Sequence, residues 1–110
     1  MENLNELNDV SLLTNFQETV GEWASTTFPE ATNQSRIEHM RMEIEELKLE
    51  PSDPMEAADI LLLLLDHAYH NNYDLLTAGK KKFKIIQGRT WGPPNDMGVV
   101  EHIRSEDEST

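Results

Sequence analysis

Two acidic pairs with the same spacing are the residues of this sequence best suited to chemistry: Glu43 with Glu46, and Glu56 with Asp59. Residues three apart are neighbours on a helix surface, so each pair would share one face. If the two helices run antiparallel across the proline-containing break between them, the four carboxylates converge. Such a cluster predicts a binding site for hard divalent cations.

The type of cation follows from what the sequence contains and lacks. It has no cysteine, and no histidine is an obvious partner of the acidic pairs, so oxygen ligands favour Mg²⁺ or Mn²⁺ over Zn²⁺. Two alternatives stay open, because an acidic pair can be a solvated helix face and Glu56 can complement a helix dipole. They explain Asp59 less well, since Ile60 and five leucines follow it and a carboxylate against a buried helix needs a partner or a metal.

Positive charge is concentrated in one segment of a chain whose net charge is −12. Five of the nine Lys and Arg residues lie between Lys80 and Arg89. Lys82 and Arg89 are seven residues apart, two turns along one helix face, so both can reach one polyphosphate. The alternative is a lysine-rich helix end that offsets the helix dipole. His39 shares a face with Glu43 and is a weaker candidate for substrate contact, because a surface histidine is the commoner case.

The hydrophobic pattern predicts the helices that position these residues, and no convincing strand apart from a weak possibility over 99–103. Helices are expected over 10–26, 36–49, 54–70 and 74–87. The second helix should begin after a cap at Ser35, with Glu38 completing a capping box. Its expected buried stripe consists of Ile37, Met40, Ile44 and Leu47. The third helix is apolar around its circumference and must be covered on several sides, which favours contact between subunits.

Composition limits the class of protein. We expect a flexible N-terminus over 1–9, one folded domain over 10–104 and an acidic disordered tail over 105–110. The negative charge argues against binding nucleic acid or an anionic membrane. No stretch resembles a signal peptide, and the longest apolar run is too short to span a bilayer. These features predict a soluble cytoplasmic protein, in the host cytoplasm if a phage encodes it.

Taken together, the motifs resemble a known family. The segments Glu43-Ile-Glu-Glu46 and Glu56-Ala-Ala-Asp59, followed by Lys82 and Arg89, resemble the all-α MazG-like nucleoside triphosphate pyrophosphohydrolases. The stretches HMRMEIEELKLEPSDPMEAADILLLLLDHA and GRTWGPPNDMGVVEHIR are most similar to the dATP/dGTP branch found in phages, and the likeness covers residues 16–104. Two departures concern the substrate: Ile86 stands where the family often has asparagine, and the gap over 47–55 is short.

The resemblance implies a fold and an activity. The fold would be an all-α, four-helix bundle-like MazG type with an irregular C-terminal tail, assembled as a homodimer or homotetramer. The reaction would be hydrolysis of a nucleoside triphosphate, dGTP or dATP, to the monophosphate and pyrophosphate. Two or more Mg²⁺ ions, for which Mn²⁺ can substitute, would be held by Glu43, Glu46, Glu56 and Asp59. One of these carboxylates can instead serve as general base.

The resemblance also gives roles to residues outside the acidic pairs. Lys82 and Arg89 would hold the phosphate chain. Trp23, Phe28 and Trp91 are candidates to stack on the base, with ordinary packing as the commoner role of such side chains.

Two other functions remain to be distinguished. One is the same reaction on a pyrimidine or modified nucleotide. The other is a non-catalytic acidic helical protein that binds a basic partner or mimics nucleic acid. A mimic needs no cationic segment, and only an enzyme or nucleotide-binding protein should be stabilised by magnesium with nucleotide.

Overall fold

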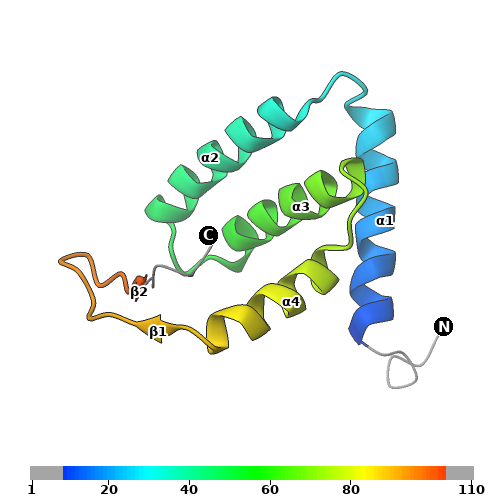
Figure 1. The fold of residues 1–110 in the computed structure, drawn as a ribbon. Helices are drawn as coiled ribbons and strands as arrows, with labels where there is room; N and C mark the ends of the chain where they lie inside the picture. The colour runs from blue at the N-terminus through cyan, green and yellow to red at the C-terminus, as the bar shows by residue number, and fades with distance from the viewer. Residues whose placement is uncertain (1–8, 104–110) are drawn as a thin grey trace. The chain divides into compact units, whose positions relative to one another are not determined.

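The computed structural model describes residues 9–103, and the chain divides into two compact units, the first ending at Ala78 and the second beginning at Gly79. Figure 1 shows the order of elements: α1 (Asp9–Thr27), α2 (Asn33–Leu49), α3 (Pro54–His70), α4 (Leu75–Gln87), β1 (Thr90–Trp91) and β2 (His102–Ile103). Four helices and two short strands confirm the all-α class. The single domain over 10–104 stays a prediction, and the expectations for the two chain ends fall, apart from Asp9 in α1, outside the described residues.

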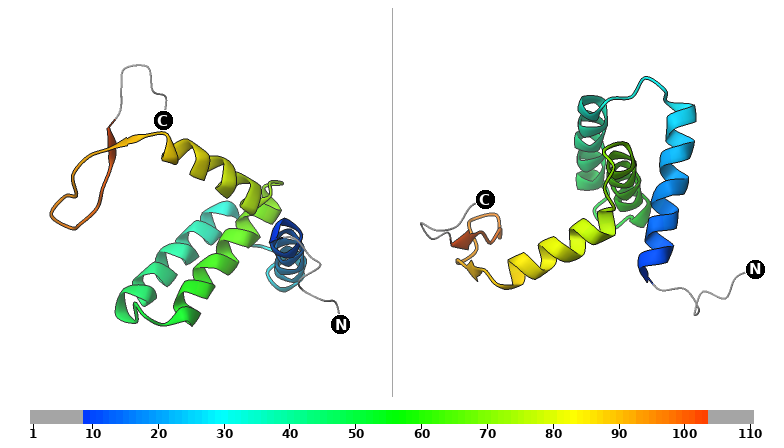
Figure 2. Two further views of the ribbon diagram at one scale, coloured as in Figure 1. Left: turned by 90° about the horizontal axis from the view of Figure 1, so that it is seen from below. Right: turned by 45° about the vertical axis from the view of Figure 1, so that its right-hand side comes forward.

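Helix α3 is the centre of the first unit. It packs against α1 and against α2, which are not in contact with each other (Figures 1 and 2). Leu65 and Ala68 of α3 are fully buried. The side of α1 that meets α3 carries a glycine, Gly21, because a Cβ atom there would overlap the ring of Tyr69. This close approach fixes the position along α3 at which α1 crosses it.

The start of α2 differs from the prediction. The N-cap is Thr32, whose hydroxyl oxygen accepts a hydrogen bond from the backbone N–H of Ser35. In return, the hydroxyl oxygen of Ser35 accepts a hydrogen bond from the backbone N–H of Thr32. Ser35 therefore occupies the position expected for Glu38, and the helix begins at Asn33. Glu38 is instead paired with Arg41 at 2.7 Å on the exposed face. The predicted start of α3 is confirmed, with Asp53 as N-cap and Pro54 in the first turn.

The expected buried stripe of α2 is also wrong in part. Met40 and Leu47 are half-buried, but Ile37 and Ile44 are 55% and 47% exposed, and the buried residue of the helix is Arg36. Within the first unit, α1 and α2 cover α3, and Leu61, Leu62 and Leu64 remain 37–40% exposed. The first unit by itself therefore leaves apolar surface on both α2 and α3 uncovered.

The second unit contains most of α4 and a small hairpin. Asp74 caps α4 by accepting hydrogen bonds from the backbone N–H and the hydroxyl of Thr77. Strands β1 and β2 pair antiparallel, with Thr90 opposite Ile103 and Trp91 opposite His102 (Figure 2). The weak strand signal over 99–103 is thus confirmed only at His102 and Ile103, and its partner strand of two residues is too short to give a hydrophobic pattern. No helix in the described part of the chain is long and apolar enough to cross a bilayer.

Candidate active site

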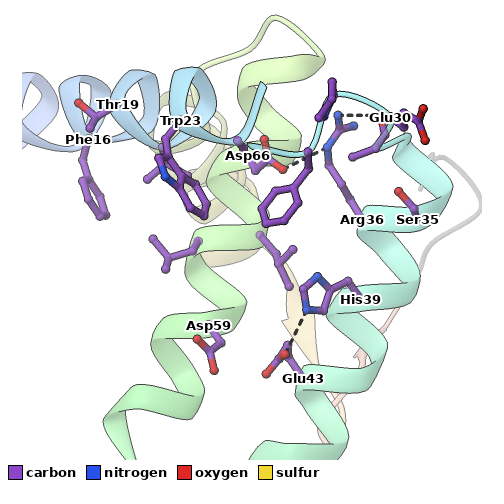
Figure 3. A pocket seen from close by; sticks show the side chains of 17 residues that line it. Phe16, Thr19, Trp23, Glu30, Ser35, Arg36, His39, Glu43, Asp59 and Asp66 are labelled. Atoms are coloured by element: carbon purple, nitrogen blue, oxygen red, sulfur yellow. Dashed lines mark hydrogen bonds and ion pairs between the residues drawn. The ribbon is translucent and has the colours of Figure 1, made fainter. Parts of the chain in front are cut away.

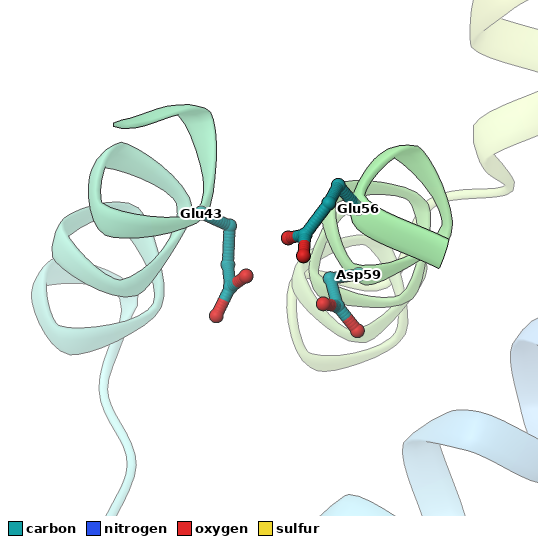
Figure 4. Close-up of side chains that lie close together, drawn as sticks. All are labelled: Glu43, Glu56 and Asp59. Atoms are coloured by element: carbon teal, nitrogen blue, oxygen red, sulfur yellow. The ribbon is translucent and has the colours of Figure 1, made fainter. Parts of the chain in front are cut away.

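Three of the four predicted carboxylates meet between α2 and α3. One oxygen of each of Glu43, Glu56 and Asp59 lies within 4.8 Å of the others, and Figure 4 shows the three side chains facing one another from the two helices. The tight break before α3 turns the chain back so that the two acidic faces meet. Converging oxygen ligands at this spacing fit the chemistry of a divalent cation.

The fourth carboxylate and the burial of Asp59 differ from expectation. Glu46 is exposed and lies outside the three-residue cluster, although its charge still acts on Glu56. Asp59 is exposed rather than pressed into a buried helix, because α3 is only partly covered in one chain. The argument for a metal site therefore rests on convergence of the carboxylates and not on burial of Asp59.

The electrostatics of Glu56 fit a site suited to a cation. Partial burial, and then repulsion from Asp59, Asp53, Glu46 and Glu43, raise the pKa of the Glu56 carboxyl above its ordinary value of 4.5. An acid with a raised pKa in the folded state contributes stability that is fully present below its ordinary pKa and is lost as pH rises through the folded value. At neutral pH, ionised Glu56 therefore destabilises the metal-free protein.

Glu56→Gln is expected to raise the thermal midpoint of the metal-free protein at pH 7, because it removes one member of a set of repelling charges. The same substitution should abolish the rise in midpoint that Mg²⁺ produces in the unchanged protein, since one ligand is lost. Circular dichroism melts in EDTA and in Mg²⁺ measure both effects. The metal-free difference should shrink as the pH is lowered toward 4.5. A lower midpoint for the variant at pH 7 in EDTA would contradict this account of Glu56.

A cavity of about 1030 Å³ lies within the first unit and opens beside two of the carboxylates. Its walls come from α1, α2, α3 and the α1–α2 loop, and they include Glu43 and Asp59 (Figure 3). Trp23, Phe28 and His39, three of the predicted substrate-binding candidates, line the same cavity. This volume is at the upper end of the range for small-molecule sites. A ligand in it would contact the cations at one end and an apolar wall elsewhere.

The aromatic wall and His39 have defined partners. Trp23 and Phe28 meet edge to face with ring centroids 5.4 Å apart, and Trp23 is 60% exposed. Exposure of a large ring toward a cavity, rather than burial, is what base stacking requires. The Nε2 atom of His39 lies 3.2 Å from Glu43 Oε1, so the histidine can hold Glu43 in place.

The sequence patterns do not single out Arg36, and for Asp66, seven residues after Asp59, they predict a cap or a salt-bridge partner. Asp66 is such a partner: Arg36 Nε lies 3.2 Å from Asp66 Oδ2, both side chains are buried, and both line the cavity. A signal was present, because Arg36 precedes Glu43 by seven residues and Asp66 follows Asp59 by seven. On antiparallel helices, residues with these offsets from a facing pair must also face each other.

Lys82, Arg89 and Trp91 lie in the second unit, so their placement relative to the carboxylates is not described. Lys82 is exposed on α4, and Arg89 Nη1 lies 3.5 Å from His102 Nδ1. Trp91 donates from its indole N–H to the carbonyl of Ile86 at 3.2 Å and meets the His102 ring edge to face. These contacts support a packing role for Trp91, while its stacking on a base stays a prediction.

The sequence is similar to proteins of one kind. It matches the family model of the dATP/dGTP pyrophosphohydrolases over residues 16–109. It is 34% identical over 88 residues, 79% of this chain, to a dATP/dGTP diphosphohydrolase of Salmonella phage PMBT28. It is 38% identical over 55 residues, 50% of this chain, to a dATP/dGTP diphosphohydrolase of Cyanophage S-2L. The chain spans 30% of the length of the first relative and 51% of the second.

The fold has a counterpart among solved structures. A MazG-like pyrophosphohydrolase of Cyanophage S-2L, bound to dGDP and three catalytic Mn²⁺ ions per active site, superposes with a TM-score of 0.73 at 31% sequence identity. The superposition covers 89% of this chain and all of the cyanophage chain. The likeness therefore extends over most of the sequence and over the helices that carry the acidic cluster.

Proposed function

This chain belongs to the dATP/dGTP pyrophosphohydrolase family, and we propose on that premise that it hydrolyses dATP and dGTP to the nucleoside monophosphate and pyrophosphate. The observation that carries the proposal is the shared cavity. Glu43 and Asp59, two members of the acidic cluster, line the same space as Trp23 and Phe28. A triphosphate at the carboxylates can thus place its base against the aromatic wall. The cyanophage protein binds dGDP and Mn²⁺ ions, which supports a purine nucleotide and divalent cations as the ligands here.

We assign the cations to the acidic residues. Glu43, Glu56 and Asp59 are the proposed ligands, and Glu46, whose charge acts on Glu56, is proposed to join them. Bound Mg²⁺, or Mn²⁺ in its place, supplies a Lewis acid that polarises phosphoryl oxygens, lowers the pKa of a water and offsets the charge of pyrophosphate. The cyanophage protein's three ions support a site with more than one cation.

The residues of the chain then have distinct tasks in the reaction. Water attacks the α-phosphorus, one of the acidic-pair carboxylates accepts its proton, and the bond from the α-phosphorus to the bridging oxygen breaks to release pyrophosphate. His39 keeps Glu43 oriented. Lys82 and Arg89 are proposed to hold the phosphate chain, which the clustering of cations on and just after α4 supports.

We further propose that the chain works as a homodimer or homotetramer in the cytoplasm, that of the host cell if a phage encodes it. Exposed apolar side chains on α2 and α3, among them Ile37, Ile44 and Leu61, support assembly because a lone chain leaves them in water. The cytoplasm is the compartment that holds the nucleotide substrates.

A panel of nucleoside triphosphates, assayed with Mg²⁺ for pyrophosphate and for inorganic phosphate, tests the proposed activity. We expect pyrophosphate and monophosphate from dATP and dGTP, with kcat/KM at least about tenfold above that for dCTP and dTTP. A tenfold preference requires a difference of only about 1.4 kcal/mol in binding free energy between purine and pyrimidine substrates. Inorganic phosphate as the product would contradict the reaction class, and equal rates with pyrimidines would contradict the substrate class. A thermal midpoint indifferent to Mg²⁺ and nucleotide would favour a non-catalytic acidic protein.

A further inference from the structure

A buried ion pair lies at one end of the cavity and the acidic cluster at the other. Figure 3 shows Arg36 and Asp66 facing each other across the upper part of the cavity, with Glu43 and Asp59 below them. Arg36 and Asp66 are only 7% and 8% exposed. The side chains that hold this pair in place belong to the first unit, as do all the residues that line the cavity.

The separation of the two ends suits a nucleotide. Glu43 follows Arg36 by seven residues on α2, and Asp66 follows Asp59 by seven residues on α3. At a rise of 1.5 Å per residue, each separation is about 10 Å along the helix axis. That length is comparable to the reach of a nucleoside phosphate from its α-phosphorus to the far edge of its base. A substrate whose phosphate meets the acidic cluster would therefore bring its base toward Arg36.

Arg36 has donors to offer a base. Its Nε–H is directed to Asp66 Oδ2, its Nη1 donates to Asn33 Oδ1 at 2.9 Å, and its Nη2 lies 3.4 Å from the carbonyl oxygen of Ala31. A guanidinium carries five N–H groups, so two of them have no acceptor among the described residues. The pairing with Asp66 and Asn33 fixes the plane of the guanidinium, which makes it a rigid donor.

Asp66 has an acceptor of its own. Its Oδ1 atom is buried and has no well-aligned hydrogen bond among the described residues. That oxygen lies 2.7 Å from His70 Nδ1, but the same nitrogen is 3.0 Å from the backbone carbonyl of Asp66, so its single proton has two competing acceptors. The end of the cavity thus presents unused donors beside a carboxylate oxygen that is incompletely satisfied.

We propose that Arg36 donates a hydrogen bond to N7 of the purine base, with Asp66 holding the guanidinium in position; this assignment rests on the proposed function. N7 is an acceptor in adenine and in guanine alike, and pyrimidines have no equivalent atom. At position 6 the two purines differ: guanine O6 accepts the second free N–H of Arg36, and the adenine amino group donates to Asp66 Oδ1. One pair of side chains thereby selects both purines.

An analogue that lacks N7 tests the contact without changing the protein. In the unchanged chain with Mg²⁺, 7-deaza-dGTP should show a KM about ten- to a hundredfold above that of dGTP, as expected for loss of a hydrogen bond to a charged group, with kcat little changed. Equal KM values for the two nucleotides would overturn the proposal. The rate of pyrophosphate release from dGTP itself is the separate measure of the proposed function, so either idea can fail alone.

A variant then assigns the contact to Arg36. Arg36→Lys keeps the positive charge beside Asp66 but loses the planar guanidinium with its fixed N–H donors. The ratio of KM values for 7-deaza-dGTP and dGTP should therefore fall to about one. Arg41→Lys, on the exposed face of the same helix, is the matched control and should keep the full ratio. An undiminished ratio in folded Arg36→Lys would mean that another donor meets N7.

A second variant covers the case in which Arg36→Lys does not fold. Asn33 is exposed and anchors Nη1 of Arg36, so Asn33→Ala frees one side of the guanidinium without breaking the Arg36–Asp66 pair. The KM ratio should then fall severalfold. A ratio equal to that of the unchanged protein would contradict the role of the held guanidinium.

Discussion

Asp59→Asn is expected to lower kcat for pyrophosphate release from dGTP by about a hundred- to a thousandfold, the range seen when one group that stabilises developing charge is removed. Asparagine has almost the same shape, and Asp59 is exposed, so folding should be unaffected. What changes is the charge of the three-carboxylate cluster, which is proposed to bind cations that offset charge on the leaving group. Steady-state rates over a range of Mg²⁺ concentrations measure the effect and should show weaker dependence on the metal.

Glu45→Gln is the matched control for Asp59→Asn. Glu45 lies on α2 between Glu43 and Glu46, but it points away from the cluster and is exposed, with its carboxylate 3.4 Å from Lys48 Nζ. Removal of this charge should leave kcat within about twofold of the unchanged protein, because exposed ion pairs contribute little. Equal losses in the two variants would indicate that overall negative charge, and not the cluster, governs the rate.

The spacing of the acidic residues predicted most of the site because helix geometry is regular. Once α2 and α3 were expected on either side of a short break, Glu43 had to face the residues at the start of α3, and the structure shows Glu43, Glu56 and Asp59 together. The superposition with the MazG-like cyanophage protein confirms the fold that the same motifs indicate. Glu46 differs because its side chain emerges nearer the solvent side of α2.

Burial was harder to predict, since it depends on what covers each helix. The leucines of α3 were expected to be enclosed on several sides, yet within the first unit it is α1 and α2 that pack against this helix, and Leu62 remains 38% exposed. A hydrophobic pattern indicates that a surface is buried in the functional protein, but it does not indicate whether the residues that bury it belong to the same chain. The exposed Ile37 and Ile44 of α2 have the same explanation.

Asp66→Ala is expected to lower the free energy of unfolding by about 3–5 kcal/mol, because it leaves the buried guanidinium of Arg36 without its counter-charge. A domain of this kind is stable by only about 5–15 kcal/mol, so the loss can approach the whole stability. Urea unfolding followed by circular dichroism provides the measurement. Glu38→Ala breaks the exposed pair with Arg41 on the same helix and should change the midpoint little. A small effect of Asp66→Ala would show that water reaches Arg36 in solution.

The double variant Arg36→Met with Asp66→Leu distinguishes the structural role of this pair from its role in selecting the base. Replacement of both partners of a buried ion pair by apolar side chains is often neutral or stabilising, so most of the stability lost in Asp66→Ala should return. The donors for N7 would still be absent. If Arg36 donates a hydrogen bond to the base, the double variant must fold and release pyrophosphate from dGTP with a raised KM. Its KM values for 7-deaza-dGTP and dGTP must then be equal. If the pair only supports the packing of α2 on α3, the refolded variant must keep the full preference for N7.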